Sequence, residues 1–373
     1  MNQISDYLYA KASRNKIPLQ GTFELSPVCN FTCKMCYVRK TPAQIEAAGK
    51  RLRTWTEWLE LAKKCHAEGM LYLLLTGGEP FLYPHFRELY EALHKMGIII
   101  YINSNGTMID RDTVDWLKTM APARINITLY GASPETYERI CGQAGGYERA
   151  VNAIEMLREA GIPVVINASM IPENRDDLEA IMTFGKERGL NTRVATYMFP
   201  PARRDKEETD SRFTPQESAD NFMRKQRFLV PKEEWKTFLE RQLEKVQSNE
   251  ATSAEDAETW GTDEEYMKCR AGRSSFWISW DGSMTSCGLT TFPVVKYPFK
   301  ESFKECWREL TDAVRTIPVL RGCSGCPKKE LCRPCVAMIQ VETGDTNAKA
   351  PYLCNMTDCL MERLRTSLDE LEE

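Results

Sequence analysis

The sequence has no long apolar run, few histidines and no surplus of basic residues. No segment approaches the roughly 20 consecutive apolar residues that a membrane-spanning helix needs, so we expect no membrane partner. Lys and Arg number 49 and Asp and Glu number 53, and the resulting net charge of −4 argues against nucleic acid as a partner. The N-terminus lacks the apolar core of a signal peptide, which predicts a cytoplasmic protein.

Cysteine, in contrast, is abundant. A reducing cytosol does not maintain structural disulfides, so the 14 cysteines indicate metal binding or catalysis. The three histidines lie away from every cysteine cluster, which favours sites built from thiolates alone over mixed Cys/His zinc sites. Cys65 and Cys306 have helical neighbours, and we expect them to be small buried hydrophobic residues.

The first two hundred residues alternate short apolar runs with helical patterns. This alternation predicts an α/β fold, and its six repeats suit a partial (β/α)6 TIM-like barrel better than a closed barrel of eight units. The predicted strands are residues 22–25, 72–76, 98–103, 124–129, 163–169 and 192–198. We expect three parts: this barrel over 1–200, a bridging helix and acidic linker over 201–265, and a cysteine-rich domain with a C-terminal helix over 266–373.

Three cysteines follow the first predicted strand with the spacing C-x3-C-x2-C. Cys29, Cys33 and Cys36 can hold three irons of a cubane cluster and leave the fourth iron without a protein ligand. Active sites of such barrels lie at the carboxyl ends of the strands. The position therefore favours an open iron–sulfur cluster over structural zinc, which takes four closed ligands.

The next strand ends in TGGEP, residues 76–80. One βα unit after C-x3-C-x2-C, this segment resembles the Gly-Gly-Glu-Pro motif of the radical S-adenosylmethionine (radical SAM) superfamily. The resemblance covers about residues 21–197. In the family this motif binds the amino group of S-adenosylmethionine, a role that the resemblance assigns here to Gly77, Gly78, Glu79 and Pro80. The glycines are expected to let the backbone approach the ligand closely.

The resemblance also implies a reaction. A 4Fe–4S cluster on Cys29, Cys33 and Cys36 would bind S-adenosylmethionine and cleave it with one electron from an external donor, a flavodoxin or ferredoxin. The resulting 5′-deoxyadenosyl radical would remove a hydrogen atom from the substrate. Further cofactor contacts that the resemblance implies fall on Ser104, Asn105, Thr128, Arg139 and Asn167.

Each of the strand-end residues in that set has a simpler alternative. Polar residues at strand ends commonly cap the following helix. Arg139 stands two residues before the position where many relatives carry arginine, and that position is Cys141, whose role is left open.

The C-terminal cysteines resemble the SPASM extension of radical SAM enzymes. Seven cysteines match its spacing except for one gap, which is two residues instead of three, before Cys335. The resemblance implies one auxiliary 4Fe–4S cluster on Cys323, Cys326, Cys332 and Cys354, and a second on Cys269, Cys287 and Cys335, whose fourth ligand is not evident. Cys359 could exchange roles with Cys354. A zinc ribbon is the alternative, but it leaves three of these cysteines unexplained.

Two substrate classes remain. SPASM-bearing relatives include peptide maturases and anaerobic sulfatase-maturating enzymes, so we expect a peptide or protein substrate that is crosslinked or oxidised. Only about twenty residues precede the first predicted strand, so a separate leader-peptide-binding protein is a possible partner. The alternative is a dehydrogenase, epimerase or decarboxylase of a small molecule such as a sugar or haem precursor. Tyr130, Tyr197 and Asp281 are positional candidates for an acid, a base or a radical-quenching group.

Overall fold

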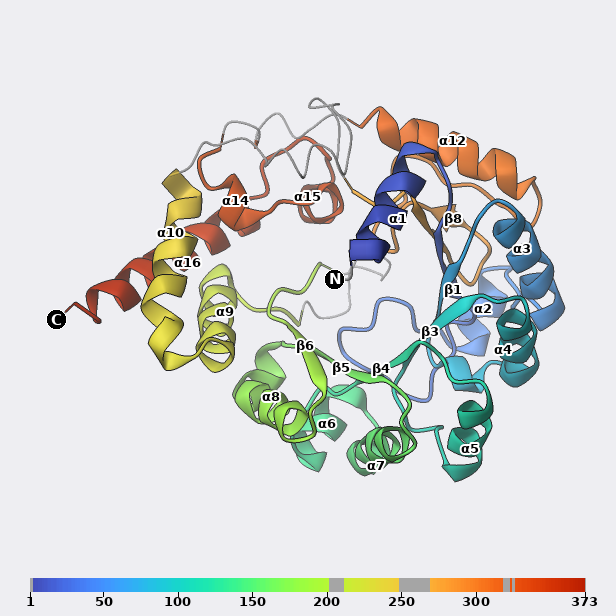
Figure 1. Ribbon diagram of the computed structural model, residues 1–373, viewed down its shortest axis with the longest axis horizontal. Helices are drawn as coiled ribbons and strands as arrows, with labels where there is room; N and C mark the ends of the chain where they lie inside the picture. Colours follow the sequence, from blue (N-terminus) through green and yellow to red (C-terminus); the bar gives the residue numbers. More distant parts are fainter. Residues whose placement is uncertain (1–2, 201–210, 248–268, 318–322, 324–325, 373) are drawn as a thin grey trace.

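A computed structural model describes residues 3–200, 211–247, 269–317, 323 and 326–372. Its centre is an eight-stranded sheet in the order β6-β5-β4-β3-β2-β1-β7-β8. The first six strands are parallel neighbours, which confirms the predicted partial barrel. Figure 1 shows the sheet as an open arc with helices on its convex side.

The strands and helices have the following bounds. The strands are β1 Gln20–Glu24, β2 Tyr72–Thr76, β3 Ile99–Ser104, β4 Arg124–Thr128, β5 Val164–Ser169, β6 Asn191–Ala195, β7 Ser275–Ile278 and β8 Met284–Thr285. The helices up to β6 are α1 Gln3–Arg14, α2 Pro42–Ala47, α3 Trp55–Ala67, α4 Phe86–Lys95, α5 Arg111–Thr119, α6 Pro134–Cys141, α7 Gly146–Glu159 and α8 Leu178–Glu187. The later helices are α9 Pro215–Leu229, α10 Trp235–Gln247, α12 Phe303–Arg315, α14 Lys329–Cys332, α15 Val336–Thr343 and α16 Pro351–Asp369. Short 3-10 turns are η1 Pro80–Leu82, η2 Pro172–Asp177 and η3 Lys232–Glu234.

Alternation along each strand separates a helix-facing side from an inner side. On β1, Phe23 is fully buried, and its ring lies 4.9 Å from that of Trp58 on α3. Neighbouring residues in a strand point to opposite faces, so Glu24 points to the inner side. There its buried carboxylate accepts a hydrogen bond of 3.1 Å from the Trp277 indole of β7. The inner side of the sheet is therefore polar where the outer side is apolar.

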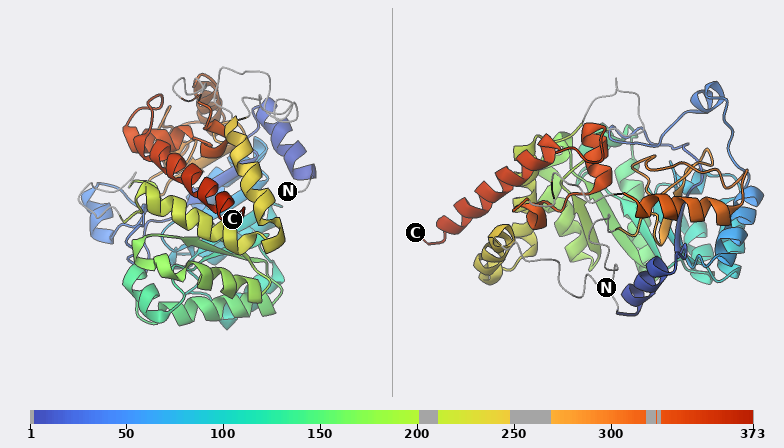
Figure 2. Two further views of the ribbon diagram at one scale, coloured as in Figure 1. Left: turned by 90° about the vertical axis from the view of Figure 1, so that its left-hand side faces the viewer. Right: turned by 90° about the horizontal axis from the view of Figure 1, so that it is seen from above.

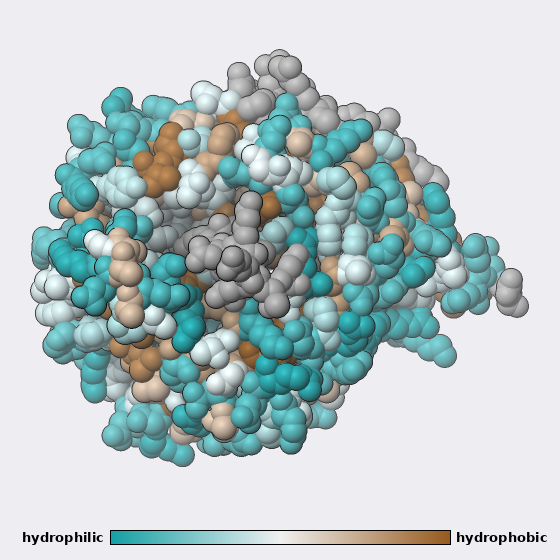
Figure 3. Space-filling model, turned by 180° about the vertical axis from the view of Figure 1, so that it is seen from behind, coloured by the Kyte–Doolittle hydropathy of each residue, from teal (hydrophilic) through white to brown (hydrophobic). Residues whose placement is uncertain are grey.

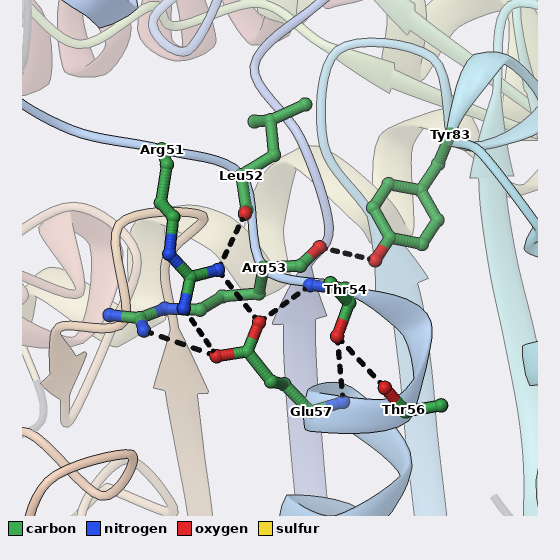
Figure 4. A network of polar contacts seen from close by, with 7 residues as sticks. All are labelled: Arg51, Leu52, Arg53, Thr54, Thr56, Glu57 and Tyr83. Atoms are coloured by element: carbon green, nitrogen blue, oxygen red, sulfur yellow. Dashed lines mark hydrogen bonds and ion pairs between the residues drawn. The ribbon is translucent and has the colours of Figure 1, made fainter.

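The start of α3 is fixed by a reciprocal cap. Thr54 accepts a hydrogen bond from the Glu57 backbone N–H, and the Glu57 side chain accepts one from the Thr54 N–H (Figure 4). Arg51 pairs with Glu57 through both guanidinium Nη atoms, at 2.7 and 2.8 Å. The Tyr83 hydroxyl donates to the Arg53 carbonyl at 2.6 Å. This contact ties the chain entering α3 to the segment that follows the GGEP motif.

The C-terminal part of the chain completes the sheet. β7 pairs with β1 in parallel, and β8 pairs with β7 in antiparallel orientation. Figure 2 shows α16 lying alongside α9 and α10 at the other end of the molecule. Between α15 and the chain entering α9, Arg212 and Glu342 form an ion pair of 2.8 Å with side chains only 8% and 7% exposed. The sheet thus runs across the predicted boundary at residue 266, and the three-part division stays a prediction.

The region between the barrel and the cysteine-rich part of the chain is largely helical where the structure describes it. The expected bridging helix falls on α9, η3 and α10, whereas most of the acidic linker falls outside the described residues. Within the described part of the chain, no helix is both long and apolar enough to cross a membrane. Hydrophilic side chains dominate the face seen in Figure 3, with hydrophobic ones scattered among them.

Candidate active site

The cysteine loop lies directly after β1, at the carboxyl edge of the sheet. The Phe31 N–H donates to the Cys29 Sγ at 3.3 Å, and the Arg39 N–H donates to the Cys36 Sγ at 3.3 Å. The pKa of the Cys29 thiol is raised to about 12. Burial is the main cause, and the nearby Glu79, Cys33 and Cys36 also contribute to the rise. The structure therefore brings the three predicted cysteines together beside Glu79.

The two glycines of the GGEP motif support this loop. A Cβ on Gly78 would lie 2.2 Å from the Val28 carbonyl oxygen, and one on Gly77 would lie 2.4 Å from that of Ser26. Backbone hydrogen bonds from Gly78 to Ser26 and from Glu79 to Val28, at 2.7 and 3.0 Å, hold the two segments together. In the structure the close approach is thus to the chain that leads into Cys29, a contact that the sequence did not predict.

Replacing Gly78 by alanine should therefore displace the cysteine loop. Because the added methyl would clash with backbone, we expect a loss of about 1–3 kcal/mol in unfolding free energy, together with a loss of iron from the first site. Chemical denaturation and iron analysis measure both effects. Gly97→Ala is the control for iron content: no atom lies within 4 Å of a Cβ there, but the positive φ of 80° strains an alanine, so this variant should lose stability and keep its iron. Equal iron contents in the two variants would contradict the proposed support.

Glu79 is buried at the end of β2, with 1% exposure. Its carboxylate accepts hydrogen bonds from the Asn105 N–H at 2.8 Å, the Ser104 hydroxyl at 2.9 Å and the Phe81 N–H at 3.1 Å. Burial raises the pKa of Glu79 to about 7, although these three hydrogen bonds oppose the rise. No cation pairs with the carboxylate in these contacts, so the site suits a ligand that brings its own positive charge.

Asn105 joins the carboxylate to the cysteine loop. Its side-chain amide donates to the Asn30 Oδ1 at 2.8 Å and reaches the Cys29 Sγ at 3.7 Å. The Asn105 Oδ1 accepts from the Thr107 hydroxyl at 2.7 Å, and Asn30 donates to that hydroxyl at 2.8 Å. Asn30 and Thr107 were not among the predicted site residues. Their only sequence signal was position, since each lies within two residues of a predicted site residue.

The remaining predicted cofactor contacts are distributed unevenly. Thr128 and Asn167 are register partners at the carboxyl ends of β4 and β5, so they share this edge. Pro80 begins the η1 turn, which Glu79 caps. Arg139, in contrast, is exposed on α6 and donates to the Glu173 carbonyl at 2.8 Å. None of its hydrogen bonds among the described residues reaches Glu79 or the cysteines.

Cys141 is the cysteine whose placement the sequence left open. It is fully buried at the end of α6, and its carbonyl accepts a hydrogen bond of 2.8 Å from the Thr32 N–H of the cysteine loop. A hydrogen bond with the Cys141 thiol, together with burial, raises the pKa of Cys33. The cysteine loop thus packs directly on the end of α6.

The C-terminal cysteines fall into two groups. Burial raises the pKa of Cys323 and of Cys332, and in both cases the neighbouring thiols of Cys326 and Cys354 add to the rise. Cys323 also raises the pKa of Cys332, so these four cysteines form one group. Burial likewise raises the pKa of Cys269, with Cys335 among the nearby thiols. Cys287 lies on the chain after β8, bridged to Thr290. Cys359 packs against the apolar cluster formed by α9, α10 and α16.

The donor sets fit iron–sulfur clusters. Among the described residues, no three His, Cys, Asp or Glu side chains converge on a position for a single metal ion. In a cubane cluster each thiolate binds a different iron, so the ligands need not converge on one point. Partly buried thiols with backbone N–H groups directed at the sulfurs of Cys29, Cys36 and Cys269 suit such clusters, whose potential depends on hydrogen bonds of this kind.

Comparison with known proteins agrees with this site. Residues 23–185 match the family model described as the radical SAM superfamily. The chain is 26% identical to the AdoMet-dependent heme synthase of Methanosarcina barkeri over 336 residues, covering 88% of this chain and 94% of that protein. It is 30% identical to the PqqA peptide cyclase of Ruegeria pomeroyi over 172 residues, covering 46% of this chain and 45% of the relative. This chain therefore spans less than half of that peptide-cyclising relative.

A solved structure extends the similarity beyond the barrel. The fold matches Streptococcus suis SuiB bound to the precursor peptide SuiA with a TM-score of 0.65 at 17% identity, over 92% of this chain and 78% of SuiB. At this identity the match speaks for the fold alone, including its C-terminal part. The cysteine loop and the GGEP carboxylate meet at one sheet edge, within the segment that the family model matches, so residues 23–185 form a radical SAM domain.

Proposed function

We propose that this radical SAM enzyme modifies a peptide or protein. The observation that carries the proposal is the placement of Cys29, Cys33 and Cys36 beside the buried Glu79 carboxylate at the carboxyl edge of the sheet. The peptide substrate is supported by relatives named as peptide cyclases and by the fold shared with SuiB. When bound, the cluster and S-adenosylmethionine supply the one-electron cleavage that starts hydrogen abstraction.

The residues around Glu79 would hold the cofactor in place. The buried carboxylate would bind its ammonium group, with Ser104 and Asn105 fixing the carboxylate orientation through their hydrogen bonds. Thr128 and Asn167 lie side by side at the same edge, where Thr128 would contact the carboxylate of the cofactor and Asn167 its ribose. Asn105 would also position Cys29, so that one side chain couples the cofactor site to the cluster loop.

The affinity for S-adenosylmethionine should depend on pH through Glu79. Its pKa of about 7 in the free protein means that the carboxyl group is largely neutral at lower pH, whereas the ammonium it binds stays charged. We expect the dissociation constant to rise about five-fold between about pH 7 and about pH 6. Equilibrium dialysis with the reconstituted enzyme measures this. Glu79→Gln should bind weakly at both pH values, and an equal pH slope in that variant would contradict the assignment.

The same shift has a consequence for stability. The folded protein holds the Glu79 proton more tightly than the unfolded chain, so its contribution favours folding below the usual glutamate pKa and is lost as the pH rises through about 7. Bound S-adenosylmethionine would oppose this loss, since its positive charge favours the ionised carboxylate.

The two C-terminal cysteine groups would hold two auxiliary 4Fe–4S clusters. One would use Cys323, Cys326, Cys332 and Cys354, which lie near one another, and the other would use Cys269, Cys335 and Cys287. The radical SAM cluster on Cys29, Cys33 and Cys36 would receive its electron from a flavodoxin or ferredoxin. A separate leader-peptide-binding protein is a further partner in this proposal.

A second candidate function has one specific observation in its favour. The similarity to the AdoMet-dependent heme synthase extends over 94% of that relative, whereas the peptide cyclase matches over 45%. A decarboxylase acting on a haem precursor is therefore the competing proposal. It predicts recognition of several carboxylates on a flat aromatic ligand.

One experiment separates the two functions. The reconstituted enzyme is supplied with S-adenosylmethionine, a reductant, and either a candidate peptide or a carboxylate-bearing porphyrin, and 5′-deoxyadenosine is quantified. We expect the peptide to raise the formation of 5′-deoxyadenosine above the level without substrate, and we expect the mass of the peptide to change. Stimulation by the porphyrin alone, with loss of carbon dioxide, would replace the first proposal by the second.

A further inference from the structure

A pocket lies at the seam between the barrel and the C-terminal part of the chain. It has a volume of about 510 Å³, and its lining includes Lys40, Ser279, Asp281, Thr290 and Gln340. Ligand sites in proteins commonly have volumes of about 300–1,000 Å³.

The pocket belongs to the catalytic edge of the sheet. β7 runs parallel to β1, with Phe23 paired to Ile278, so the chain after Ile278 leaves the sheet at the same edge as the cysteine loop. Trp280, which lines the pocket, packs in one apolar cluster with Val38, Ile45 and the partly buried Cys36. Trp280 therefore joins the pocket lining to the apolar cluster against which the third cysteine of the loop packs.

The opposite wall comes from the cysteine-rich part of the chain. Thr290, which is bridged to Cys287, donates a hydrogen bond from its hydroxyl to the side-chain oxygen of Gln340. Gln340 lies on α15, whose N-cap residue is Cys335. The pocket thus has the radical SAM cysteine loop on one side and two cysteines of the proposed auxiliary site on the other.

The lining is rich in neutral hydrogen-bonding groups. Hydroxyls come from five residues, and an amide comes from Gln340; the hydroxyl residues are Ser279, Ser283, Thr285, Thr290 and Thr291. Of the two charged lining residues, Asp281 already accepts a hydrogen bond of 2.6 Å from Ser283 and pairs with Lys50 at 3.5 Å. Lys40 is therefore the one lining residue whose charge suits an anion, and a single lysine is a poor match to a ligand with several carboxylates.

The hydroxyls of Ser283, Thr285 and Thr290 already donate within the protein, so the lining offers mainly acceptor oxygens together with the Gln340 amide, and these groups match the N–H and C=O groups of a polypeptide. We propose that the pocket binds the peptide segment to be modified, with Thr290 and Gln340 contacting its backbone. This inference rests on the proposed function and specifies where the substrate lies. It makes Thr290 and Gln340 positioning residues for the substrate, with no role in cleaving S-adenosylmethionine.

The test uses the reconstituted full-length enzyme and a phage-displayed library of random peptides. The library is selected on the wild type and, in parallel, on the Thr290→Val, Gln340→Ala double variant and on the exposed-surface control Thr366→Val. Peptides retained by the wild type are then synthesised. Their dissociation constants are measured for all three proteins, with iron content and circular dichroism as checks of folding.

We expect peptides enriched on the wild type and on Thr366→Val to bind the double variant at least about five-fold more weakly, as expected for lost hydrogen bonds. Formation of 5′-deoxyadenosine without peptide should be unchanged in Thr366→Val. Equal binding to the double variant, or no enrichment on the wild type, would overturn the assignment of the pocket. If the selected peptides bind in the pocket but neither stimulate turnover nor become modified, the proposed function fails while the binding site stands.

Discussion

Replacing Cys33 by alanine is expected to abolish reductive cleavage of S-adenosylmethionine. A cubane held by three thiolates has no spare protein ligand, so the loss of one leaves the cluster without its attachment. Cys33 is the thiol most tightly packed in the loop, since it contacts Cys141 at the end of α6. The expected result is a decrease of about four irons per chain after anaerobic reconstitution and no 5′-deoxyadenosine above background.

Cys65→Ala is the matched control for this loss. Cys65 is fully buried on α3 within the apolar core, as the sequence analysis expected. Its replacement removes a thiol from the barrel without touching the cysteine loop, so iron content and cleavage should match the wild type. Retention of cleavage in Cys33→Ala would show that Cys141 or another residue takes over as ligand, and would contradict the proposed cluster.

Replacing Cys326 by alanine should have the second-largest effect, and this effect falls on solubility and iron content instead of on cleavage. Cys326 lies near Cys323 and Cys332, and the Cys326 N–H donates to the Cys323 carbonyl at 3.1 Å. Metal binding supplies folding free energy to small cysteine-rich regions, so we expect lower solubility and the loss of about four irons per chain. Cleavage of S-adenosylmethionine without substrate should persist, because the barrel site is intact.

Cys359→Ala separates a cluster ligand from a packing residue. Cys359 contacts the apolar cluster shared by α9, α10 and α16, and its replacement should cost some stability without loss of iron. Iron and sulfide analysis of both variants, beside the thermal unfolding midpoint, gives the comparison. Equal iron loss in the two variants would mean that Cys359 exchanges roles with Cys354, an alternative that the cysteine spacing leaves open.

Local pattern was enough to predict the barrel. Each of the six predicted strands overlaps its observed counterpart, because parallel strands buried on the helix side leave a clear apolar run between helical stretches. The start of β1 was missed by two residues: Gln20 and Gly21 look like loop but pair with Tyr72 and Leu73. Burial and register, which depend on the partner strand, decided that boundary.

The site was predictable in its residues but less so in its connections. Spacing identified the cysteine loop and Glu79, whereas the network through Asn30 and Thr107 depends on loop geometry that spacing does not encode. The same holds for Gly78, whose neighbour is the Val28 carbonyl. The pairing of β7 with β1 was also missed, because a contact between strands about 250 residues apart in the chain leaves little local signal.

That pairing has a consequence for biosynthesis. β1 is made early, yet one edge of it has no partner until β7 leaves the ribosome about 250 residues later. During that interval the nascent barrel exposes a row of unpaired backbone groups, which is a template for association with other chains. Chaperone demand should therefore persist until translation is nearly complete, and chains truncated before residue 275 should aggregate even though the whole cofactor-binding segment has been synthesised.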